Sequence, residues 1–190
     1  MGVCRERNWK FDWVLDVDIE KFFDTINHEL MMKAVRKHCQ ENWVALYIER
    51  WLKAPIRHED GRLESNERGT PQGGVISPLL ANLYLHYAFD SWLRRKYSRV
   101  QFERYADDII IHCQREAEAL TLKEALSNRL SECGLRLNLE KTMIVYCKAG
   151  IREGMQVVQA DTFLGYALQH RKAMGRQKRA FTSFLPAASK

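Results

Sequence analysis

Two adjacent carboxylates, Asp107 and Asp108, are the residues of this chain most suited to metal chemistry. They lie between an extended run, 100–104, and the β-branched run 109–111. Val, Ile, Phe and Tyr favour strands and Ala106-Asp107-Asp108 suits a tight turn, so the pattern predicts a hairpin with the acids at its tip. Acids that repel each other there favour a hard divalent cation, which takes oxygen ligands. A solvated turn that binds nothing is the alternative.

A third acid, Asp18, falls at the end of the run 13–19, which alternates as a strand does. Asp16 and Asp18 share one face of that strand. If the strand lies beside the hairpin in one sheet, then Asp18, Asp107 and Asp108 converge. Three such carboxylates could hold two divalent metals about 3.5–4 Å apart, as in in-line phosphoryl transfer. Asp16 is not assigned a catalytic role.

A loop of defined shape, 68–78, contains three glycines and two prolines. Glycine lets a backbone approach a ligand closely. Ser77 and Pro78 are a favourable N-cap and N1 pair, and they predict a helix from Pro78 to about Tyr97 whose N-terminus favours anions. A plain loop-to-helix connection is the alternative.

The rest of the chain alternates helical and extended patterns. The spacing of apolar residues predicts helices at 30–39, 44–52 and 116–133, the last ending at Gly134, and Asp60-Gly61 predicts a further hairpin. Extended segments are expected at 135–139, 141–147 and 162–168. This mixture predicts an α+β fold, with an antiparallel sheet and helices packed on one face.

The composition is ordinary for a soluble globular protein. No run approaches the ~18 apolar residues needed to span a bilayer, and the N-terminus lacks an apolar signal core. We therefore expect a cytoplasmic protein with no membrane partner. The five cysteines form no CxxC pair, so neither a zinc site nor a disulfide framework is expected.

Residues 169–190 are expected to form a basic C-terminal tail, in a chain of formal net charge +6. No acid follows Asp161. The basic residues after it are Arg171, Lys172, Arg176, Lys178, Arg179 and Lys190. Such a tail suits a polyanion such as nucleic acid, although a solubilising terminus has the same composition.

Five sequence strings carry a resemblance to a known family. They are VLDVDIEKFFDTINHEL (14–30), RGTPQGGVISPLLANLYLHYAFD (68–90), FERYADDIIIHC (102–113), GLRLNLEKTMIVYCK (134–148) and FLGY (163–166). In order and spacing they resemble the palm of reverse transcriptases, and in particular the reverse transcriptase/maturase encoded by bacterial group II introns. The resemblance implies a polymerase palm-like fold and RNA-directed DNA polymerase activity, that is, nucleotidyl transfer onto a primer 3′-hydroxyl. It also implies a part in intron mobility and splicing in the full-length parent.

The resemblance implies a site for two Mg²⁺ ions, with Mn²⁺ as a substitute. Asp18 and Asp107 would be direct metal ligands together with the Ile19 carbonyl. Asp108 would support the second metal or the primer end. Lys141 matches a lysine that protonates the pyrophosphate leaving group, and an ordinary surface lysine is the alternative.

Contacts with nucleotide and primer are implied in the same way. Phe23 matches a steric gate that rejects a ribose 2′-hydroxyl by clash, although a core phenylalanine is the alternative. The segment Pro71, Gln72 and Gly73 would line the pocket of the incoming nucleotide. Tyr105 would touch the primer terminus. The primer grip would be Phe163, Leu164, Gly165 and Tyr166.

The expected organisation is an N-terminal remnant or linker at 1–11, the palm at 12–168 and the basic tail at 169–190. The fingers, thumb and maturase regions of the family are missing from the chain, so we expect a piece of a larger protein that is weak or inactive alone. The expected partners are an RNA template, a DNA primer, deoxynucleoside triphosphates, group II intron RNA and the missing fingers and thumb.

Two other functions remain open. A non-catalytic, maturase-like RNA-binding remnant fits the basic tail and the missing fingers, but the retention of Asp18, Asp107 and Asp108 weighs against it. A nucleotide cyclase has a palm-like sheet, but it would carry a Gly-Gly-acid hairpin where this chain has 105–108.

Overall fold

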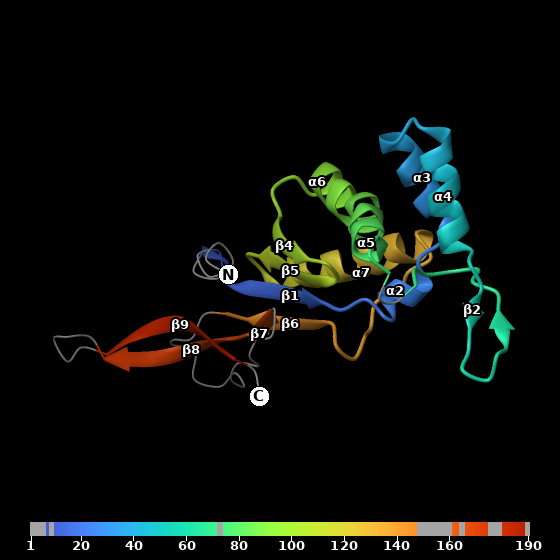
Figure 1. Ribbon diagram of the computed structural model, residues 1–190. Coiled ribbons are helices and arrows are strands. Elements are labelled where there is room, and N and C mark those ends of the chain that lie inside the picture. Colours follow the sequence, from blue (N-terminus) through green and yellow to red (C-terminus); the bar gives the residue numbers. More distant parts are fainter. Residues whose placement is uncertain are drawn as a thin grey trace. The chain divides into compact units, whose positions relative to one another are not determined.

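The chain divides into two compact units, and Figure 1 shows its helices and strands in the computed structural model. The structure describes residues 7, 10–71, 74–147, 161–163, 166–174 and 180–188. Unit 1 comprises Met1–Asp18, Arg99–Ala125 and Asn138–Lys190, and unit 2 comprises Ile19–Ser98 and Leu126–Leu137. The predicted metal ligands Asp18, Asp107 and Asp108 belong to unit 1, whereas Phe23 and the 68–78 loop belong to unit 2.

A four-stranded antiparallel sheet forms the centre of unit 1. Its strands are β1 (Trp13–Val17), β4 (Gln101–Tyr105), β5 (Asp108–Cys113) and β6 (Met143–Tyr146), in the order β4-β5-β1-β6. The β-branched run predicted to be a strand supplies its core, because Ile109, Ile110 and Ile111 are fully buried. The α+β fold with an antiparallel sheet is thus confirmed.

Unit 1 has a second antiparallel sheet of three strands. These are β7 (Asp161–Phe163), β8 (Tyr166–Met174) and β9 (Ala180–Ala188), in the order β7-β8-β9. The sequence indicated one strand at 162–168 and then a tail. The structure instead continues β8 through Arg171 and Lys172, and it pairs β8 with β9 along its length.

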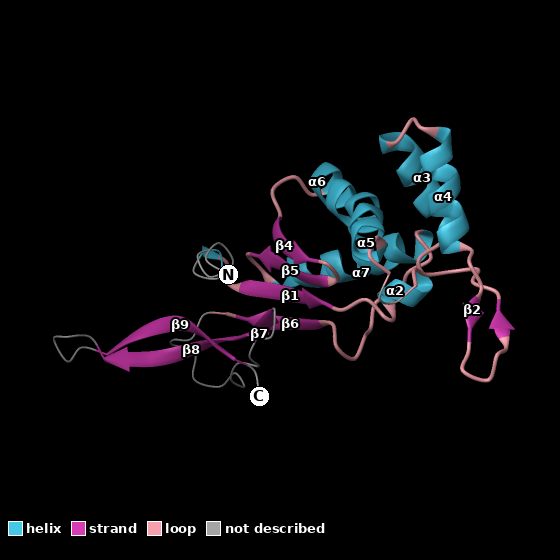
Figure 2. Cartoon of the chain, in the orientation of Figure 1, coloured by secondary structure: helices cyan, strands magenta, loops and turns pink. Residues whose placement is uncertain are grey.

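Helices make up most of unit 2 (Figure 2). They are α2 (Phe22–Thr25), α3 (His28–His38), α4 (Asn42–Leu52), α5 (Ser77–Leu85), the π-helix η1 (His86–Asp90) and α6 (Ser91–Lys96). A short hairpin, β2 (Ile56–Arg57) and β3 (Leu63–Glu64), confirms the turn predicted at Asp60-Gly61. The helix predicted from Pro78 to about Tyr97 is present, with a π-helical turn in its middle.

Helix α7 (Glu116–Glu132) ends in a cap that requires a residue in the left-handed conformation. Gly134 has φ +72°, and the N–H of Leu135 donates to the carbonyl of Leu130 at 2.9 Å. This is a Schellman cap, in which glycine adopts the left-handed conformation without strain. The prediction that Gly134 terminates this helix is confirmed.

Two local predictions were wrong. Helix α5 begins at Ser77, with Ile76 as N-cap, because the Ser77 hydroxyl donates to the Pro71 carbonyl at 2.7 Å and so is not used as a cap. Segment 135–139 is not a strand; only Leu137 makes a single antiparallel bridge, to Ile19. In the part of the chain that the structure describes, no helix is long and apolar enough to cross a membrane.

Candidate active site

The register of the central sheet brings the ends of two acid-bearing strands together. Val17, the last residue of β1, pairs with Ile109 of β5. Asp18 follows Val17 directly, and Asp108 precedes Ile109 as the first residue of β5. Asp18 and Asp108 therefore leave the sheet at the same edge, as the spacing of these acids predicted.

Asp107 lies in the loop that joins β4 to β5. Tyr105 pairs with Asp108, so the loop has two residues, Ala106 and Asp107. Ala106 has φ +53°, a left-handed conformation that costs an L-residue roughly 1 kcal/mol or more. The tight hairpin thus accepts backbone strain at the residue before Asp107. The turn is one residue shorter than the Ala-Asp-Asp turn that the sequence indicated.

The backbone of Asp18 is held by a turn that follows α7. The N–H of Asn138 donates to the Asp18 carbonyl at 2.9 Å. The Thr142 hydroxyl accepts from the Asp18 N–H at 3.2 Å and donates to the Asp18 carbonyl at 3.3 Å. Thr142 is only 3% exposed, so these bonds are shielded from water. Asn138 and Thr142 therefore fix the position from which the Asp18 side chain extends.

The same turn carries Lys141. The N–H groups of Glu140 and Lys141 both donate to Asn138 Oδ1 at 3.2 Å, and the Thr142 N–H donates to the Asn138 carbonyl at 2.8 Å. Lys141 is exposed. It thus extends into solvent from the turn that holds Asp18.

The acids at this edge have the chemistry of a magnesium site. Asp18 is half-buried, and neither it nor Asp107 has a side-chain hydrogen bond or ion pair among the described residues, whereas Asp108 does have a partner. Carboxylate oxygens are the donors that Mg²⁺ prefers. No group of three or more His, Cys, Asp or Glu in the described residues is arranged to hold a metal ion. The donor set fits the ion by type.

In unit 2, the 68–78 loop is tied to the segment that carries Phe23. The N–H of Thr70 donates to the Phe23 carbonyl at 2.7 Å, and the N–H of Gly69 donates to the Ile26 carbonyl at 2.8 Å. The buried His28 ring is bonded through Nε2 to the Gly69 carbonyl at 2.7 Å. A carbonyl only accepts, so this nitrogen carries the proton. These hydrogen bonds hold Gly69 and Thr70 against the segment 23–28.

Other predicted contact residues are placed less completely. Phe23 is half-buried and packs on Phe22 with ring centroids 5.2 Å apart, and Pro71 is exposed. Tyr105 is 66% exposed beside Asp108, which leaves its ring open to a ligand. Gln72, Gly73, Leu164 and Gly165 lie outside the described residues. Phe163 and Tyr166 are paired strand residues of β7 and β8.

The sequence did not identify Asn138, Thr142, His28 or Gly69 as residues that build the site. Asn138 and Thr142 contribute through contacts with the backbone of Asp18, whereas Gly69 bonds to the Ile26 carbonyl and His28 bonds to the Gly69 carbonyl. No periodic pattern or charge signals such contacts, and only the positive φ of Gly69 could have been guessed from residue type.

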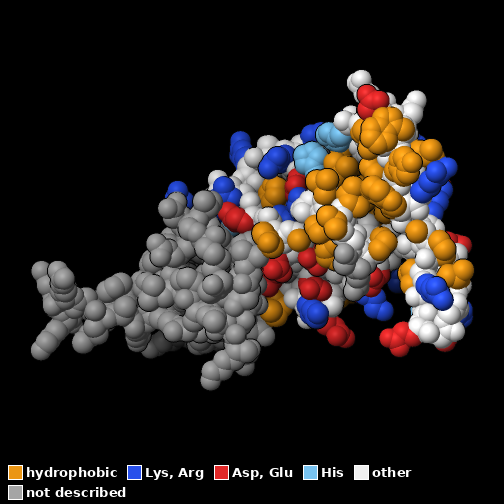
Figure 3. Space-filling view, viewed as in Figure 1, with side chains coloured by type: hydrophobic (Ala, Val, Ile, Leu, Met, Phe, Trp, Pro, Cys, Tyr) orange, Lys and Arg blue, Asp and Glu red, His pale blue; other side chains and the backbone are white. Residues whose placement is uncertain are grey.

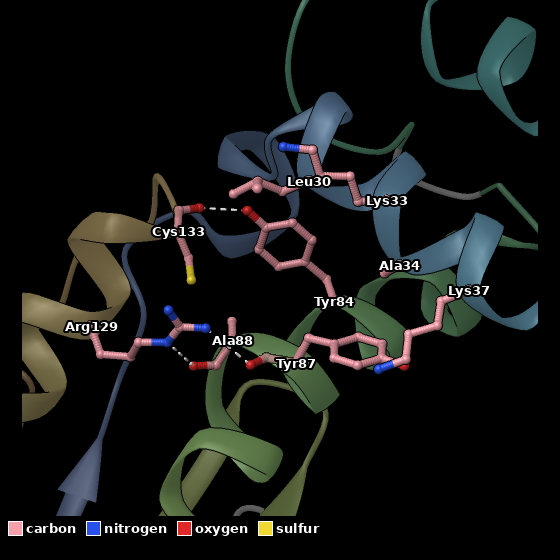
Figure 4. Close-up of a pocket in the computed structure, with 9 residues that line it drawn as sticks. All are labelled: Leu30, Lys33, Ala34, Lys37, Tyr84, Tyr87, Ala88, Arg129 and Cys133. Carbon is pink, nitrogen blue, oxygen red and sulfur yellow. Dashed lines mark hydrogen bonds between the residues drawn. The ribbon is translucent and has the colours of Figure 1, made fainter. Parts of the chain in front are cut away.

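A pocket of about 260 Å³ lies elsewhere in unit 2 (Figure 4). It is lined by Leu30, Lys33, Ala34, Lys37, Tyr84, Tyr87, Ala88, Arg129 and Cys133. Its central polar groups bond to the protein itself: the Tyr84 hydroxyl donates to the Cys133 carbonyl, and Arg129 donates to the carbonyls of Ala88 and Tyr87 at 3.1 and 3.2 Å. None of the predicted site residues lines this pocket, which is best described as a gap between packed helices.

Similar solved structures identify the class of fold. Telomerase from Candida tropicalis, in complex with a fragment of telomeric RNA, aligns with 88% of this chain and 31% of its own, at a TM-score of 0.67 and 14% identity. Telomerase from Candida albicans aligns with 83% of this chain and 29% of its own, at a TM-score of 0.63. The sheet with acids at its edge thus has a polymerase palm-like fold.

The sequence places the chain within that class. It belongs to the reverse transcriptase (RNA-dependent DNA polymerase) family, whose model matches residues 3–168. Protein YkfC of Escherichia coli is 29% identical over 195 residues, which cover 85% of this chain. The group II intron-encoded protein LtrA of Lactococcus lactis is 35% identical over 94 residues, which cover 48% of this chain. The relatives therefore include proteins encoded by group II introns, as the resemblance implied.

The relatives are longer than this chain. The matched segment covers 48% of YkfC and 22% of a Saccharomyces cerevisiae protein described as a putative COX1/OXI3 intron 1 protein, which is 26% identical over 185 residues. The activity and partners of those whole proteins are therefore not established for this chain by similarity alone.

Proposed function

We propose that this chain is the palm of a group II intron-encoded reverse transcriptase, which carries out RNA-directed DNA synthesis. The observation that carries the proposal is the meeting of the β1 and β5 ends, which brings Asp18 and Asp108 to the sheet edge next to Asp107. Membership of the reverse transcriptase family supports the same chemistry. An RNA template, a DNA primer and deoxynucleoside triphosphates would be its substrates, and group II intron RNA its partner.

Asp18, Asp107 and the Ile19 carbonyl would hold Mg²⁺, and Asp108 would support the second ion. Bound there, the metals would activate the primer 3′-hydroxyl and offset the charge that develops at phosphorus. The turn formed by Asn138 and Thr142 would keep Asp18 in place, since it fixes both backbone polar groups of that residue.

The remaining residues would orient the reactants. Lys141 Nζ would donate a proton to the departing pyrophosphate. Phe23 would exclude a ribose 2′-hydroxyl by its bulk, and Pro71, Gln72 and Gly73 would contact the incoming nucleotide. Tyr105 would contact the primer terminus, and the primer grip would be Phe163, Leu164, Gly165 and Tyr166.

The test combines metal binding with primer extension. Mn²⁺, which is paramagnetic, replaces Mg²⁺ in binding measurements by electron paramagnetic resonance. We expect the wild-type chain to bind Mn²⁺, Asp107→Asn to weaken binding at least tenfold, and Asp60→Asn, a change in the exposed β2–β3 turn, to have no effect. Equal binding by the wild-type chain and Asp107→Asn would overturn the metal assignment.

Primer extension on an RNA template then tests the reaction. We expect weak extension by this chain and none by Asp107→Asn. Extension that survives Asp107→Asn would contradict the assignment. Salt-sensitive RNA binding without Mn²⁺ binding would instead identify a non-catalytic RNA-binding remnant.

A further inference from the structure

The pocket between α3, η1 and the end of α7 combines an apolar wall with positive charge at its entrance (Figure 4). Its wall includes the side chains of Leu30, Ala34 and Ala88. Lys33 and Lys37 of α3 also line it, and both are exposed. No carboxylate is among the described residues that line this pocket. The pocket therefore offers apolar contact inside and unmatched positive charge where it opens to solvent.

Apolar character alone does not single out this pocket. Figure 3 shows hydrophobic side chains gathered over the part of the molecule that contains α3 and α4. A groove of about 670 Å³ next to Trp51 has no charged residue in its described lining, so nothing there selects a ligand. A pocket of about 270 Å³ between α3 and α4 holds Glu29 and Glu49 beside its cations. Of these three, only the pocket in Figure 4 combines an apolar wall with cations and no acid.

The two lysines lie one turn apart on α3. Residues four apart occupy the same side of a helix, so the ammonium groups of Lys33 and Lys37 repel each other. Lys33 makes no hydrogen bond or ion pair with any residue that the structure describes. The helix dipole favours a cation at Lys37, which is in the last turn, but Lys33 lies outside that turn. An anion bound at the pocket would offset the repulsion between the two lysines.

Tyr87 presents a fixed aromatic ring at the same pocket. The Tyr87 hydroxyl is bonded to His38 Nε2 at 2.6 Å, and its carbonyl accepts from Arg129 at 3.2 Å. The Lys37 ammonium lies over the ring, 4.9 Å from its centroid. Arg129 pairs with Glu132 at 3.1 Å, so its charge is matched within the protein. A ring held in this way is a platform on which a planar ring can stack.

The ligand class that fits these features is a nucleotide. The volume of about 260 Å³ lies just below the roughly 300–1,000 Å³ of sites for drug-sized molecules, so the pocket suits one ring system. A phosphate monoester carries a charge of about −1.5 to −2 at neutral pH, which matches two ammonium groups. A single carboxylate would leave one of the two lysines unmatched.

We propose that this pocket binds one nucleotide, with its base on the Tyr87 ring and its phosphate on Lys33 and Lys37. The base takes the place of the Lys37 ammonium over the ring, which frees that ammonium for the phosphate. The nucleotide is either free or an unpaired member of an RNA strand, whose two flanking phosphates carry a similar charge. None of the residues predicted to bind metal, primer or incoming nucleotide lines this pocket. The inference therefore does not depend on the proposed polymerase activity.

Nucleotide binding without metal tests the pocket directly. Ligand-observed NMR measures the affinity for AMP, adenosine and ribose 5-phosphate, with EDTA present to prevent metal-dependent binding at the sheet edge. We expect a millimolar dissociation constant for AMP. Adenosine and ribose 5-phosphate should bind at least fivefold more weakly, because each lacks one of the two groups that the pocket recognises. Equal affinity for AMP and adenosine overturns the proposal.

Lysine variants test the site of the phosphate. We expect Lys33→Ala to weaken AMP binding at least threefold. The matched control is Lys96→Ala in α6, where an exposed ammonium also lies over aromatic rings, 5.8 Å from the Trp92 centroid and 5.7 Å from the Tyr97 centroid. This variant should bind AMP as the wild-type chain does. Equal weakening by Lys33→Ala and Lys96→Ala would indicate general attraction to a basic protein and overturn the proposal.

Two further variants test the site of the base. Ala34→Leu extends a side chain into the pocket and should weaken AMP binding at least fivefold, while circular dichroism checks that the variant is folded. Asp107→Asn, which weakens the proposed metal site, should leave AMP binding unchanged. Loss of AMP binding in Asp107→Asn would place the nucleotide at the sheet edge and overturn the proposal. If Ala34→Leu does not fold, the Lys33→Ala comparison decides.

RNA probes identify the source of the nucleotide. One short single-stranded RNA keeps only its central base, and a second has no base at all. If the source is a strand, the first RNA should bind more tightly than AMP and several-fold more tightly than the second. Changing both Lys33 and Lys37 to Ala should then lower the slope of log affinity against log salt by about 1.4. Tighter binding of AMP identifies a free nucleotide. Equal binding of both RNAs, with no binding of AMP, overturns the proposal.

Discussion

The Asp18 backbone shows how a residue without charge can determine where a carboxylate lies. Thr142 binds both the N–H and the carbonyl of Asp18 from a buried position. The N–H and the carbonyl of Asp18 belong to the two peptide groups that flank its Cα, so Thr142 restrains both of them. The side chain of Asp18 therefore starts from a fixed point, although its carboxylate has no partner among the residues that the structure describes.

Replacement of Thr142 by valine should weaken the fold and the metal site together. Valine has nearly the same shape but no hydroxyl, so the buried Asp18 N–H loses its acceptor, at a cost of about 1–3 kcal/mol. We expect a lower Tm and weaker Mn²⁺ binding. Thr142→Ser, which keeps the hydroxyl, should retain most of the binding. Unchanged Mn²⁺ affinity in Thr142→Val would show that Asp18 is placed by other contacts.

Sequence alone identified the acids because their types and spacing are unusual. Asp18 at a strand end and Asp107 in a hairpin loop were predicted, and the structure brings their strands together. Asn138 and Thr142 could not be found in this way, because they act through hydrogen bonds to a backbone distant in the chain. Such pairs become visible only once the strand register is known.

At the scale of elements, Gly69 determines how the 68–78 loop meets the Phe23 segment. Its φ is +84°, and a Cβ added there would lie 2.7 Å from the Phe23 carbonyl oxygen and 2.8 Å from two backbone atoms of Asp24. Gly61, in the β2–β3 turn, has the same φ but no atom within 4 Å of an added Cβ. Alanine substitutions at these two glycines therefore distinguish the cost of a left-handed backbone from the cost of a steric clash.

Gly69→Ala should therefore destabilise the fold much more than Gly61→Ala. We expect about 1 kcal/mol for Gly61→Ala, from the left-handed backbone alone. Gly69→Ala adds a clash with backbone atoms that do not yield easily, and should cost roughly 3 kcal/mol or more. Urea denaturation of both variants measures the difference. Equal losses would mean that the loop can move away from Phe23.

The elements themselves were largely predictable. Hydrophobic periodicity located α3, α4 and α7, and the β-branched run located β5. The failures have physical causes. Ser77 does not cap its helix because its hydroxyl is used by Pro71, and 135–139 alternates without finding a strand to pair with beyond Ile19. The residue pattern of one segment does not show which groups elsewhere in the chain will take its hydrogen bonds.

At the scale of the whole molecule, a buried thiol and a buried phenol make the stability of the fold sensitive to high pH. Burial, and then the nearby charge of Glu118, raises the pKa of the Cys113 thiol to about 12. Burial likewise raises the pKa of the Tyr84 hydroxyl to about 12. In both cases the folded state keeps its proton when the unfolded chain has already lost it, so unfolding releases protons.

The contribution of these two groups to stability should therefore be constant below about pH 9 and fall as the pH rises towards 12. We expect Tm to drop by at least about 5 °C between pH 9 and pH 11. Cys113→Ala should start from a lower Tm at pH 8, because it leaves a cavity, but should show a shallower fall. A slope identical to that of the wild-type chain would show that other groups cause the alkaline loss.

The central position of β1 has a consequence for how the chain is made. Trp13 pairs with Cys113 on one side and Tyr146 on the other, so β1 is synthesised roughly 100 residues or more before either of its neighbours. At roughly 5–20 residues per second, β1 waits for about 5–20 seconds before β5 is synthesised, and longer before β6. During that delay its apolar residues Val14 and Leu15 have no sheet to join. The nascent chain should therefore depend on chaperones until β5 and β6 have been synthesised.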